Sequence, residues 1–350
     1  MDTRSSGTPA SAEQDSGADS RRHWRLFLIG TGLLVLCGLT LAAVRVAWFD
    51  PYWIFREHPP WLSVTGGANR LIDRQTRRAK TLQALSRDYT VALIGSSTVY
   101  HGLNPDDVDG PFRGRVFNAG ISALIADELP IVARVVASRP DVERAVVGLD
   151  YFMFSRGDVP VRLSPSLGQA TGRANARLGS LFSEYALDDS AIDKIAGGED
   201  PGSWTYAGFR VTPKLPRELT RHNDELRRRT AMAYRPETLQ SLAMVLRSLA
   251  PRRVTLYISP VSDAQRRVLA DAGLSDDFER WRADVLRTAA ANGLAALDLA
   301  DLGTAFPFAP EEGSTDAWLD NLHFTPVLGR MVLEKVGLRS PKAPAAASPQ

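Results

Sequence analysis

The stretch Thr90–Tyr100 constrains the fold of this chain most. Residues 90–94 are apolar, mostly β-branched and uncharged, and the run has the length of one strand. Such a run is typical of a strand that is buried on both faces, as in a parallel sheet. The run stops at Gly95, and Ser96 and Ser97 follow. Because open α/β sheets bind ligands at the carboxyl ends of their strands, we expect a functional hydroxyl group at this point.

Apolar strand runs and amphipathic helical patterns alternate along the rest of the chain. The runs expected as further strands are 115–120, 144–150, 253–258 and 293–299, and the expected helices are 126–138, 236–249, 276–291 and one opened by Thr325-Pro326. Strands that alternate with helices indicate a parallel sheet with right-handed crossovers. The sequence therefore predicts an α/β fold of three layers with about five parallel strands.

One region, residues 155–235, breaks this alternation. It is rich in Gly, Pro, Ser and charged residues, and it is too long for a simple connection in a compact domain. We expect an insertion within the main domain (88–338), near the functional edge of the sheet, as a lid or a substrate platform.

The amino-terminal part predicts a membrane anchor at residues 26–48. Leu26–Val44 is 19 residues long and uncharged, and Arg21, Arg22 and Arg25 precede it. This is about the length that crosses a bilayer as a helix, and basic residues mark the cytoplasmic side. We therefore expect a single-pass protein of the inner (cytoplasmic) membrane whose amino terminus is cytoplasmic and whose main domain is periplasmic or extracellular. A cleaved signal peptide and a buried soluble helix are the rival interpretations.

The segments that flank the anchor and the main domain have distinct compositions. Residues 1–25 and 339–350 are predicted to be disordered tails, and 49–87 a juxtamembrane linker and helix. The helix expected over 68–86 carries several basic residues, and we expect these to lie on a solvated face or to face acidic lipid or an anionic polymer.

The composition excludes several classes of function. A formal net charge of +2 over 350 residues does not indicate a nucleic-acid partner. The single cysteine, Cys37, lies within the apolar run, so neither an intrachain disulfide nor a cysteine metal site is available. No cluster of His, Asp and Glu has metal-ligand spacing, and we expect no metal and no cofactor.

Ser97, Asp320 and His323 are the candidate catalytic residues. A serine at a strand end is often only a helix cap, and an Asp-x-x-His pair is often only a pair on a loop. Together, on an α/β background, they supply a nucleophile, an orienting acid and a base. His101 is the competing base, because it lies four residues after Ser97. We prefer His323, since Asp320 can orient its ring.

These residues resemble the sequence blocks of the SGNH/GDSL hydrolase superfamily. The α/β-hydrolase elbow is a poorer match, because the glycine expected two residues after the nucleophile is Val99. In the resemblance, Gly95-Ser96-Ser97 matches the nucleophile block, which leaves a choice between Ser96 and Ser97 that depends on the alignment of Gly95. Asp320 and His323 match the last block.

The resemblance also assigns the oxyanion and substrate-binding positions. It places Gly120, within Asn118-Ala119-Gly120, as an oxyanion-hole glycine, and Asp150 where the family has an asparagine that donates to the oxyanion. An ionised carboxylate would oppose the developing charge, so Asp150 is expected to be protonated, turned away or used for another purpose.

Among its members, the chain resembles the membrane-anchored relatives such as the alginate acetylation proteins and DltD-like proteins. The resemblance implies a flavodoxin-like SGNH fold and a serine esterase or O-acyltransferase. It also implies acyl (acetyl) esters of a surface polysaccharide as substrates and polysaccharide-assembly proteins as partners. The alternative is a catalytically impaired SGNH-like protein that binds glycan or assists assembly.

Overall fold

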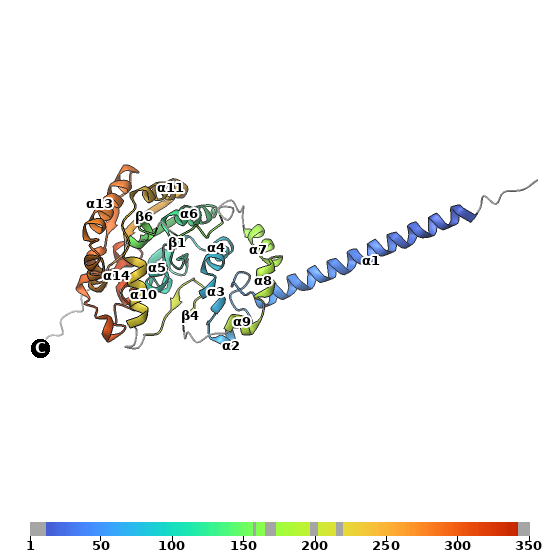
Figure 1. Cartoon of the computed structure of the whole chain (residues 1–350), viewed down its shortest axis with the longest axis horizontal. Helices are drawn as coiled ribbons and strands as arrows, with labels where there is room; N and C mark the ends of the chain where they lie inside the picture. Colours follow the sequence, from blue (N-terminus) through green and yellow to red (C-terminus); the bar gives the residue numbers. More distant parts are fainter. Residues whose placement is uncertain (1–11, 157–158, 165–172, 197–201, 215–219, 342–350) are drawn as a thin grey trace, which may run out of the picture.

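A parallel sheet of five strands lies at the centre of the main body (Figure 1). The computed structural model describes residues 12–156, 159–164, 173–196, 202–214 and 220–341. The sheet has the order β2-β1-β3-β6-β7, and its strands are β1 (Val91–Ile94), β2 (Val116–Asn118), β3 (Arg144–Leu149), β6 (Arg253–Ile258) and β7 (Ala296–Asp298). Counted along the chain within this sheet, the order is 2-1-3-4-5, which is that of flavodoxin-like folds. The predicted α/β class and the five parallel strands are confirmed.

Alternate residues of the strands enter two separate apolar cores. In β1, Ala92 and Ile94 belong to one core, while Val91 and Leu93 belong to the other. All four side chains are fully buried, which is why the strand has no polar position. Its uncharged sequence follows from its place in the middle of the sheet.

Helices cover both faces of the sheet. Four helices pack on the first face: α4 (Thr76–Ser86), α6 (Leu129–Ala137), α11 (Leu239–Leu249) and α13 (Ser275–Ala291). The other face is covered by α5 (Ser97–Gly102) and α14 (Pro326–Lys335), together with Ala264 of α12 (Asp263–Asp271). The structure is therefore three-layered.

The helix expected over 68–86 is divided in the structure. It consists of α3 (Arg70–Arg74) and α4, and Gln75 separates them in a non-helical conformation. The expectation that its basic residues face solvent, lipid or a polymer is wrong for three of them. Arg70 and Lys80 are buried, and Arg77 donates to the buried carboxylate of Glu128.

The predicted insertion forms two groups of elements. The first contains three helices, α7 (Arg173–Leu181), α8 (Glu184–Asp188) and α9 (Ile192–Ala196), which lie beside the root of the amino-terminal helix (Figure 1). The second contains the antiparallel pair β4 (Ser203–Trp204) and β5 (Arg210–Val211), followed by α10 (Thr220–Thr230). The second group reaches the carboxyl edge of the central sheet.

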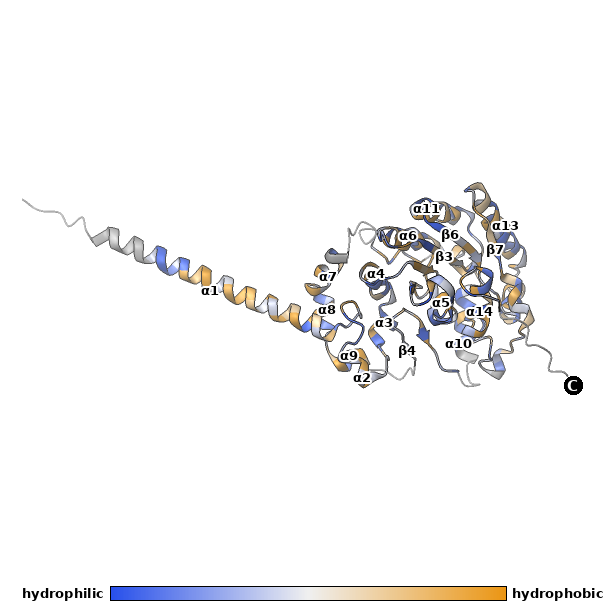
Figure 2. Ribbon diagram, turned by 180° about the vertical axis from the view of Figure 1, so that it is seen from behind, coloured by the Kyte–Doolittle hydropathy of each residue, from blue (hydrophilic) through white to orange (hydrophobic). Residues whose placement is uncertain are grey.

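The amino-terminal helix α1 (Ala12–Phe49) projects from the body (Figure 2). Its part from Ser20 to Phe49 is long and apolar enough to cross a membrane, and the most apolar part of it makes no buried contact with the body. Residues 12–25 were expected within a disordered tail but are helical, because they continue α1. The last turns pack on the body, where Val46 is buried with residues of α8 and α9.

The beginning of the predicted carboxyl-terminal tail is held to the body. The Arg339 side chain donates to the carbonyl oxygen of Asp107 at 2.7 Å, and the N–H of Ser340 donates to the Asp109 carboxylate at 2.9 Å. Residues 1–11 and 342–350, also predicted as tails, lie outside the described residues.

Candidate active site

Ser97 is positioned by a tight turn between β1 and α5. It is the first residue of α5, and the Ser96 side chain caps the helix by accepting from the N–H of Thr98. Gly95 has φ +156° and lies so close to Val99 and the Gly148 carbonyl that a Cβ atom would clash with both. Because helix hydrogen bonding leaves the first N–H groups free, the Ser97 N–H is available to an oxygen atom of a ligand.

Ser97, His323 and Asp320 form a continuous chain of hydrogen bonds. The His323 Nε2 atom lies 2.8 Å from the Ser97 hydroxyl, and His323 Nδ1 lies 2.7 Å from Asp320 Oδ2. The serine is the first residue of α5, while the other two come from the loop before α14. This is the arrangement in which an imidazole takes a proton from a serine while a carboxylate orients its ring.

Asp320 accepts four hydrogen bonds and is held as an anion. Its Oδ1 accepts from the N–H groups of Leu322 and His323, both at 2.8 Å. Burial raises its pKa, but the charge of His323 and the donated hydrogen bonds outweigh this, so the pKa of Asp320 lies far below its ordinary value.

The fourth donor to Asp320 is His222 of α10, which sequence analysis did not single out. Its Nε2 atom lies 3.1 Å from Asp320 Oδ2, the same oxygen that faces His323. The hydrogen bond to Asp320 is the main reason why the pKa of His222 is raised. The two residues are 98 positions apart, and the sequence of the insertion offers no spacing rule that would have paired them.

His101, the competing base, faces away from the serine. Its Nδ1 atom lies 2.8 Å from the Thr212 hydroxyl, and its ring packs edge-on against His323 at a centroid distance of 4.9 Å. Burial, and then the neighbouring His323, lower the pKa of His101 well below its ordinary value. His101 therefore forms a neutral wall beside His323.

Asp150 is bound to the two hydroxyl groups that flank Ser97 in sequence. Its carboxylate accepts from Ser96 at 2.5 Å and from Thr98 at 3.0 Å. Burial is the largest effect on its pKa and raises it, against the opposing effect of the hydroxyl donors. Of the three expectations for Asp150, the contacts fit another purpose, namely holding the turn that carries Ser97.

Gly120 and Asn118 are also committed to structural contacts. The N–H of Gly120 donates to the Asn118 side chain at 3.0 Å, and the Asn118 amide donates to the carbonyls of Val99 and Leu103. A Cβ atom at Gly120 would lie 2.9 Å from the Ser96 carbonyl oxygen. The role of Gly120 as an oxyanion donor stays a prediction. In this structure its N–H donates to the Asn118 side chain.

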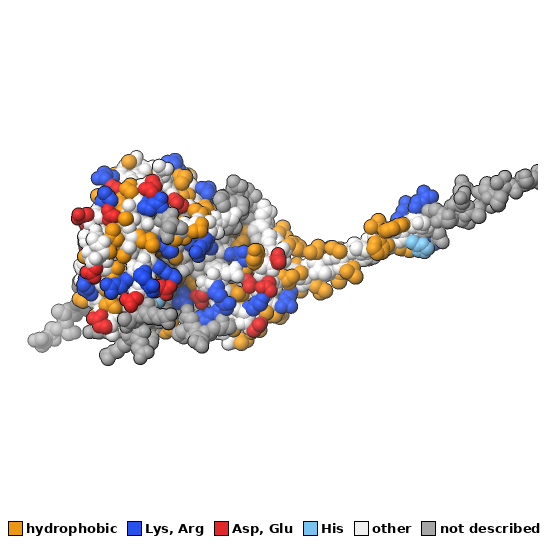
Figure 3. Space-filling view, viewed as in Figure 1, with side chains coloured by type: hydrophobic (Ala, Val, Ile, Leu, Met, Phe, Trp, Pro, Cys, Tyr) orange, Lys and Arg blue, Asp and Glu red, His pale blue; other side chains and the backbone are white. Residues whose placement is uncertain are grey.

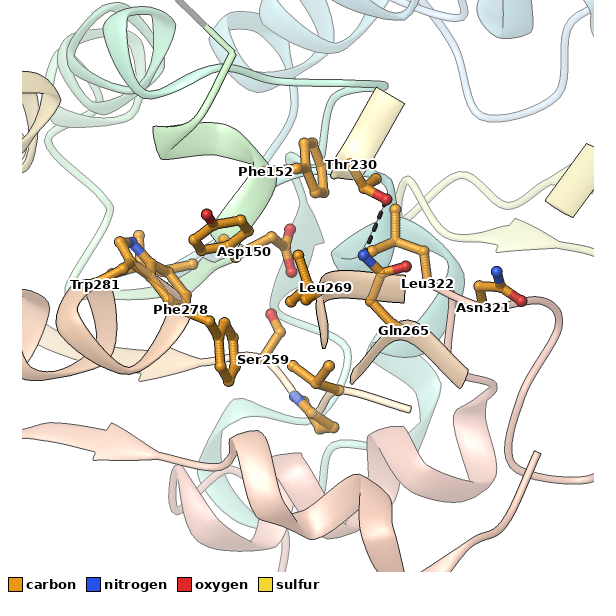
Figure 4. A pocket seen from close by; sticks show the side chains of 14 residues that line it. Asp150, Phe152, Thr230, Ser259, Gln265, Leu269, Phe278, Trp281, Asn321 and Leu322 are labelled. Carbon is orange, nitrogen blue, oxygen red and sulfur yellow. Dashed lines mark hydrogen bonds between the residues drawn. The ribbon is translucent and has the colours of Figure 1, made fainter. Parts of the chain in front are cut away.

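A small cavity lies next to Asp150 at the carboxyl edge of β3 and β6 (Figure 4). Its volume is about 20 Å³, which admits one water molecule or a group of similar size. Phe152, Leu269, Phe278 and Trp281 give it apolar walls, and Leu322, next to His323, closes one side.

Two open grooves border the same edge. One, of about 250 Å³, is lined by His101, Arg210 and Thr212, and the other, of about 410 Å³, by Asn223, Arg227 and Asn321. Within the described residues, no group of three His, Cys, Asp or Glu side chains is placed to hold a metal ion.

Comparisons with known proteins find only distant structural likenesses. No family profile and no curated protein matches it. Three similar solved structures are a protein of Streptococcus pneumonia named for platelet activating factor, the lipase/acylhydrolase of Enterococcus faecalis and the aryl esterase of M. smegmatis.

The identities to these three are 13%, 15% and 11%, and the TM-scores are 0.39, 0.38 and 0.32. The matches cover 78%, 73% and 71% of this chain and 92%, 100% and 99% of the other chains. Likenesses of this size do not transfer a function, so the proposals below depend on the residues of the site.

Proposed function

We propose that this chain is an SGNH-like serine esterase or O-acyltransferase with Ser97 as nucleophile. The observation that carries the proposal is the unbroken contact from Ser97 Oγ through His323 to Asp320, at 2.8 and 2.7 Å. In this reaction, His323 takes the proton of Ser97 as the hydroxyl oxygen attacks an ester carbonyl. The alcohol leaves with that proton, and an acyl-enzyme remains.

The second half of the reaction decides between the two activities. Water attacking the acyl-enzyme gives an esterase, whereas a sugar hydroxyl gives an O-acyltransferase. In both, His323 removes the proton of the attacking hydroxyl and returns it to Ser97, while Asp320 stabilises the imidazolium.

The substrate we propose is a short acyl ester, such as acetyl, on an extracytoplasmic polysaccharide or cell-envelope glycan. We assign the small acyl group to the cavity of about 20 Å³ beside Asp150 and Leu322, and an extended carrier to the grooves lined by His101 and by Asn321. The helix α1 supports a membrane-anchored protein with a cytoplasmic amino terminus and a periplasmic or extracellular body. Polysaccharide-assembly proteins are its proposed partners.

A serine-reactive fluorophosphonate, followed by mass mapping of the adduct, tests the nucleophile. We expect an adduct on Ser97 in the wild type and none in His323→Ala. Ser97→Ala should lower the turnover of p-nitrophenyl acetate by at least about 10³-fold. An adduct on Ser96, or retained turnover in Ser97→Ala, would overturn the assignment.

A non-catalytic, glycan-binding or assembly role is the second candidate. It is favoured by Asp150 in place of an amide donor and by the N–H of Gly120, which Asn118 already occupies. A folded wild-type protein that the fluorophosphonate does not label would support this role.

A further inference from the structure

We infer that helices α7–α9 form a membrane-interfacial seat that rests on the surface of a lipid bilayer beside α1. The seat presents the exposed apolar side chains Leu178, Phe182, Tyr185, Leu187 and Ile192. The inference rests on the proposed membrane anchor and adds to it a function for part of the insertion.

Exposed apolar side chains are concentrated in this seat. Ten large apolar side chains outside α1 are exposed among the described residues, and five of them fall between residues 178 and 192. Phe182 and Tyr185 are 59% and 60% exposed. A patch of this kind on a soluble surface marks a contact with another apolar phase.

Helices α8 and α9 carry exposed apolar side chains in addition to the apolar side chains that pack on the body. Ala186 of α8 and Ile195 of α9 are buried against Val46, so their inner sides are already packed on the body. Tyr185, Leu187 and Ile192 of α8 and α9 are exposed, and the Arg78 guanidinium lies 3.9 Å from the Tyr185 ring centroid. A helix needs only one apolar side to pack on its own domain. The further exposed apolar side chains are therefore available to contact lipid.

The depth of α1 places these helices at the edge of the hydrocarbon layer. The uncharged run Leu26–Val44 is about 28 Å long as a helix, close to the roughly 30 Å hydrocarbon core of a bilayer. Arg45 follows this run directly, and its Nε donates to the carbonyl oxygen of Ser190 at 3.0 Å. Ser190 connects α8 and α9, so this connection lies where α1 leaves the hydrocarbon.

The surroundings of α1 are consistent with this depth. Trp48 is 57% exposed one turn beyond Val44, and the Arg56 guanidinium lies 5.7 Å from its ring centroid. Aromatic and basic side chains of this kind gather at the membrane–water interface. Figure 3 shows apolar side chains along α1, and both apolar and charged side chains where α1 meets the body.

The charges of the seat indicate which lipid property it uses. The acidic residues Glu184, Asp188 and Asp193 lie on these helices. Of the basic residues, Arg177 donates to the Ser86 carbonyl oxygen at 3.3 Å, and Lys194 is paired with Asp188 at 2.7 Å. Acidic residues gain nothing from anionic lipid. The seat is therefore held by apolar side chains in the interfacial layer, and it does not require anionic headgroups.

Single-cysteine labelling of the full chain in vesicles tests the seat. In a Cys37→Ser background, a polarity-sensitive fluorophore is attached at Phe182→Cys, at Met244→Cys on α11, or at Leu34→Cys within α1. The vesicles contain phosphatidylcholine with or without spin-labelled lipid, and iodide serves as the aqueous quencher. Met244 is the matched control, because it is also apolar and partly exposed but lies on a helix away from α1.

We expect spin-labelled lipid to quench positions 34 and 182, and iodide to quench only position 244. Adding phosphatidylglycerol should leave this pattern unchanged. Quenching by lipid at 34 but not at 182 would overturn the seat and leave the anchor intact. Absence of lipid quenching at 34 would overturn the anchor, and the seat with it.

Discussion

At the scale of single residues, the carboxylates of Asp320 and Asp150 each bind more than one side chain of the site. Asp320 Oδ2 faces both His323 and His222, at 2.7 and 3.1 Å, so the insertion contributes a second imidazole to the acid of the proposed triad. Asp150 instead holds the hydroxyls of Ser96 and Thr98 and so fixes the turn around Ser97. The contacts of Asp320 affect the pH dependence of activity, and those of Asp150 affect the pH dependence of stability.

Replacing His222 should change the pH dependence of activity. Protonated His222 neutralises part of the Asp320 charge and disfavours a second proton on His323. In His222→Gln this positive charge beside Asp320 is absent. We expect the acid limb of kcat/KM for p-nitrophenyl acetate to move up by about 0.5–1 pH unit.

The matched control is His58→Gln, because His58 is an exposed histidine of the linker. Its profile should coincide with that of the wild type. A uniform loss of activity in His222→Gln, without movement of the acid limb, would mean that His222 has only a structural role.

Replacing Asp150 should change the pH dependence of stability. Since burial raises its folded pKa, Asp150 binds its proton more strongly in the folded state. This contribution is complete below the unfolded pKa and is lost as pH rises through the folded pKa. Asp150→Asn does not ionise, so its Tm relative to the wild type should rise as pH increases above about 4.

Thermal unfolding between pH 4 and 8 measures this difference. Asp106→Asn, at an exposed position, serves as the control. A flat difference for Asp150→Asn would show that its carboxylate ionises in the folded state without cost.

At the scale of elements, buried ionic groups join segments that are distant in sequence. Glu128 is fully buried, accepts two hydrogen bonds from Arg77 of α4, and also accepts from the N–H groups of Arg162 and Leu163. Lys80 of the same helix donates to the carbonyls of Asn118 and Gly208 and so ties β2 to the β4–β5 hairpin. One face of α4 therefore organises the insertion.

Removing Glu128 should destabilise the protein strongly. Glu128→Ala leaves Arg77 without its carboxylate, and the loss of one partner of such a buried pair costs about 3–5 kcal/mol. Glu143→Ala breaks an exposed pair with Arg115 and should cost no more than about 1 kcal/mol. Denaturant unfolding at pH 7 measures the unfolding free energy that each variant loses. Equal losses would contradict a structural role of the buried Glu128–Arg77 pair.

The same pair has a defined dependence on pH. Burial alone would raise the pKa of Glu128, but Arg77 and the backbone donors outweigh it, and the pKa is lowered. Its contribution to stability is thus present above the unfolded pKa and is lost as pH falls through the folded pKa. The difference in unfolding free energy between the wild type and Glu128→Ala should therefore become smaller below about pH 4.3.

At the scale of the whole molecule, α1 and the body are built from different chemistry. Leu33, Leu34 and Leu36 are exposed on α1, whereas comparable side chains of the sheet are fully buried. An apolar helix of this length is stable in contact with lipid, where its backbone groups are satisfied internally. The body carries the candidate site, and α1 carries the proposed membrane anchor.

Membrane integration should depend on the apolar character of α1. We expect the full chain to remain in membranes after an alkaline wash. Leu34→Arg combined with Leu36→Arg should release it, because each central arginine costs about 2.5–3.5 kcal/mol on insertion. Leu34→Ala with Leu36→Ala is the matched control and should stay bound. Release of the wild type would contradict the anchor.

The sequence by itself determined the features that depend on local pattern. The β1 run and the uncharged run of α1 each lie within one short segment, and every strand or helix in the alternation is recognised from its own short segment. A strand that is buried on both faces demands a matching run of apolar residues. Ser97, Asp320 and His323 were found by type and order, since few histidines compete for the role of base.

Only the tertiary structure decided which distant polar groups meet. It brought His222 to Asp320, turned Asp150 toward Ser96 and Thr98, and buried Lys80 on a helix side predicted to face outward. These contacts join segments far apart along the chain. A buried polar group needs a hydrogen-bond partner, and that partner can come from any segment that the fold brings near. The local sequence pattern does not identify which segment this is.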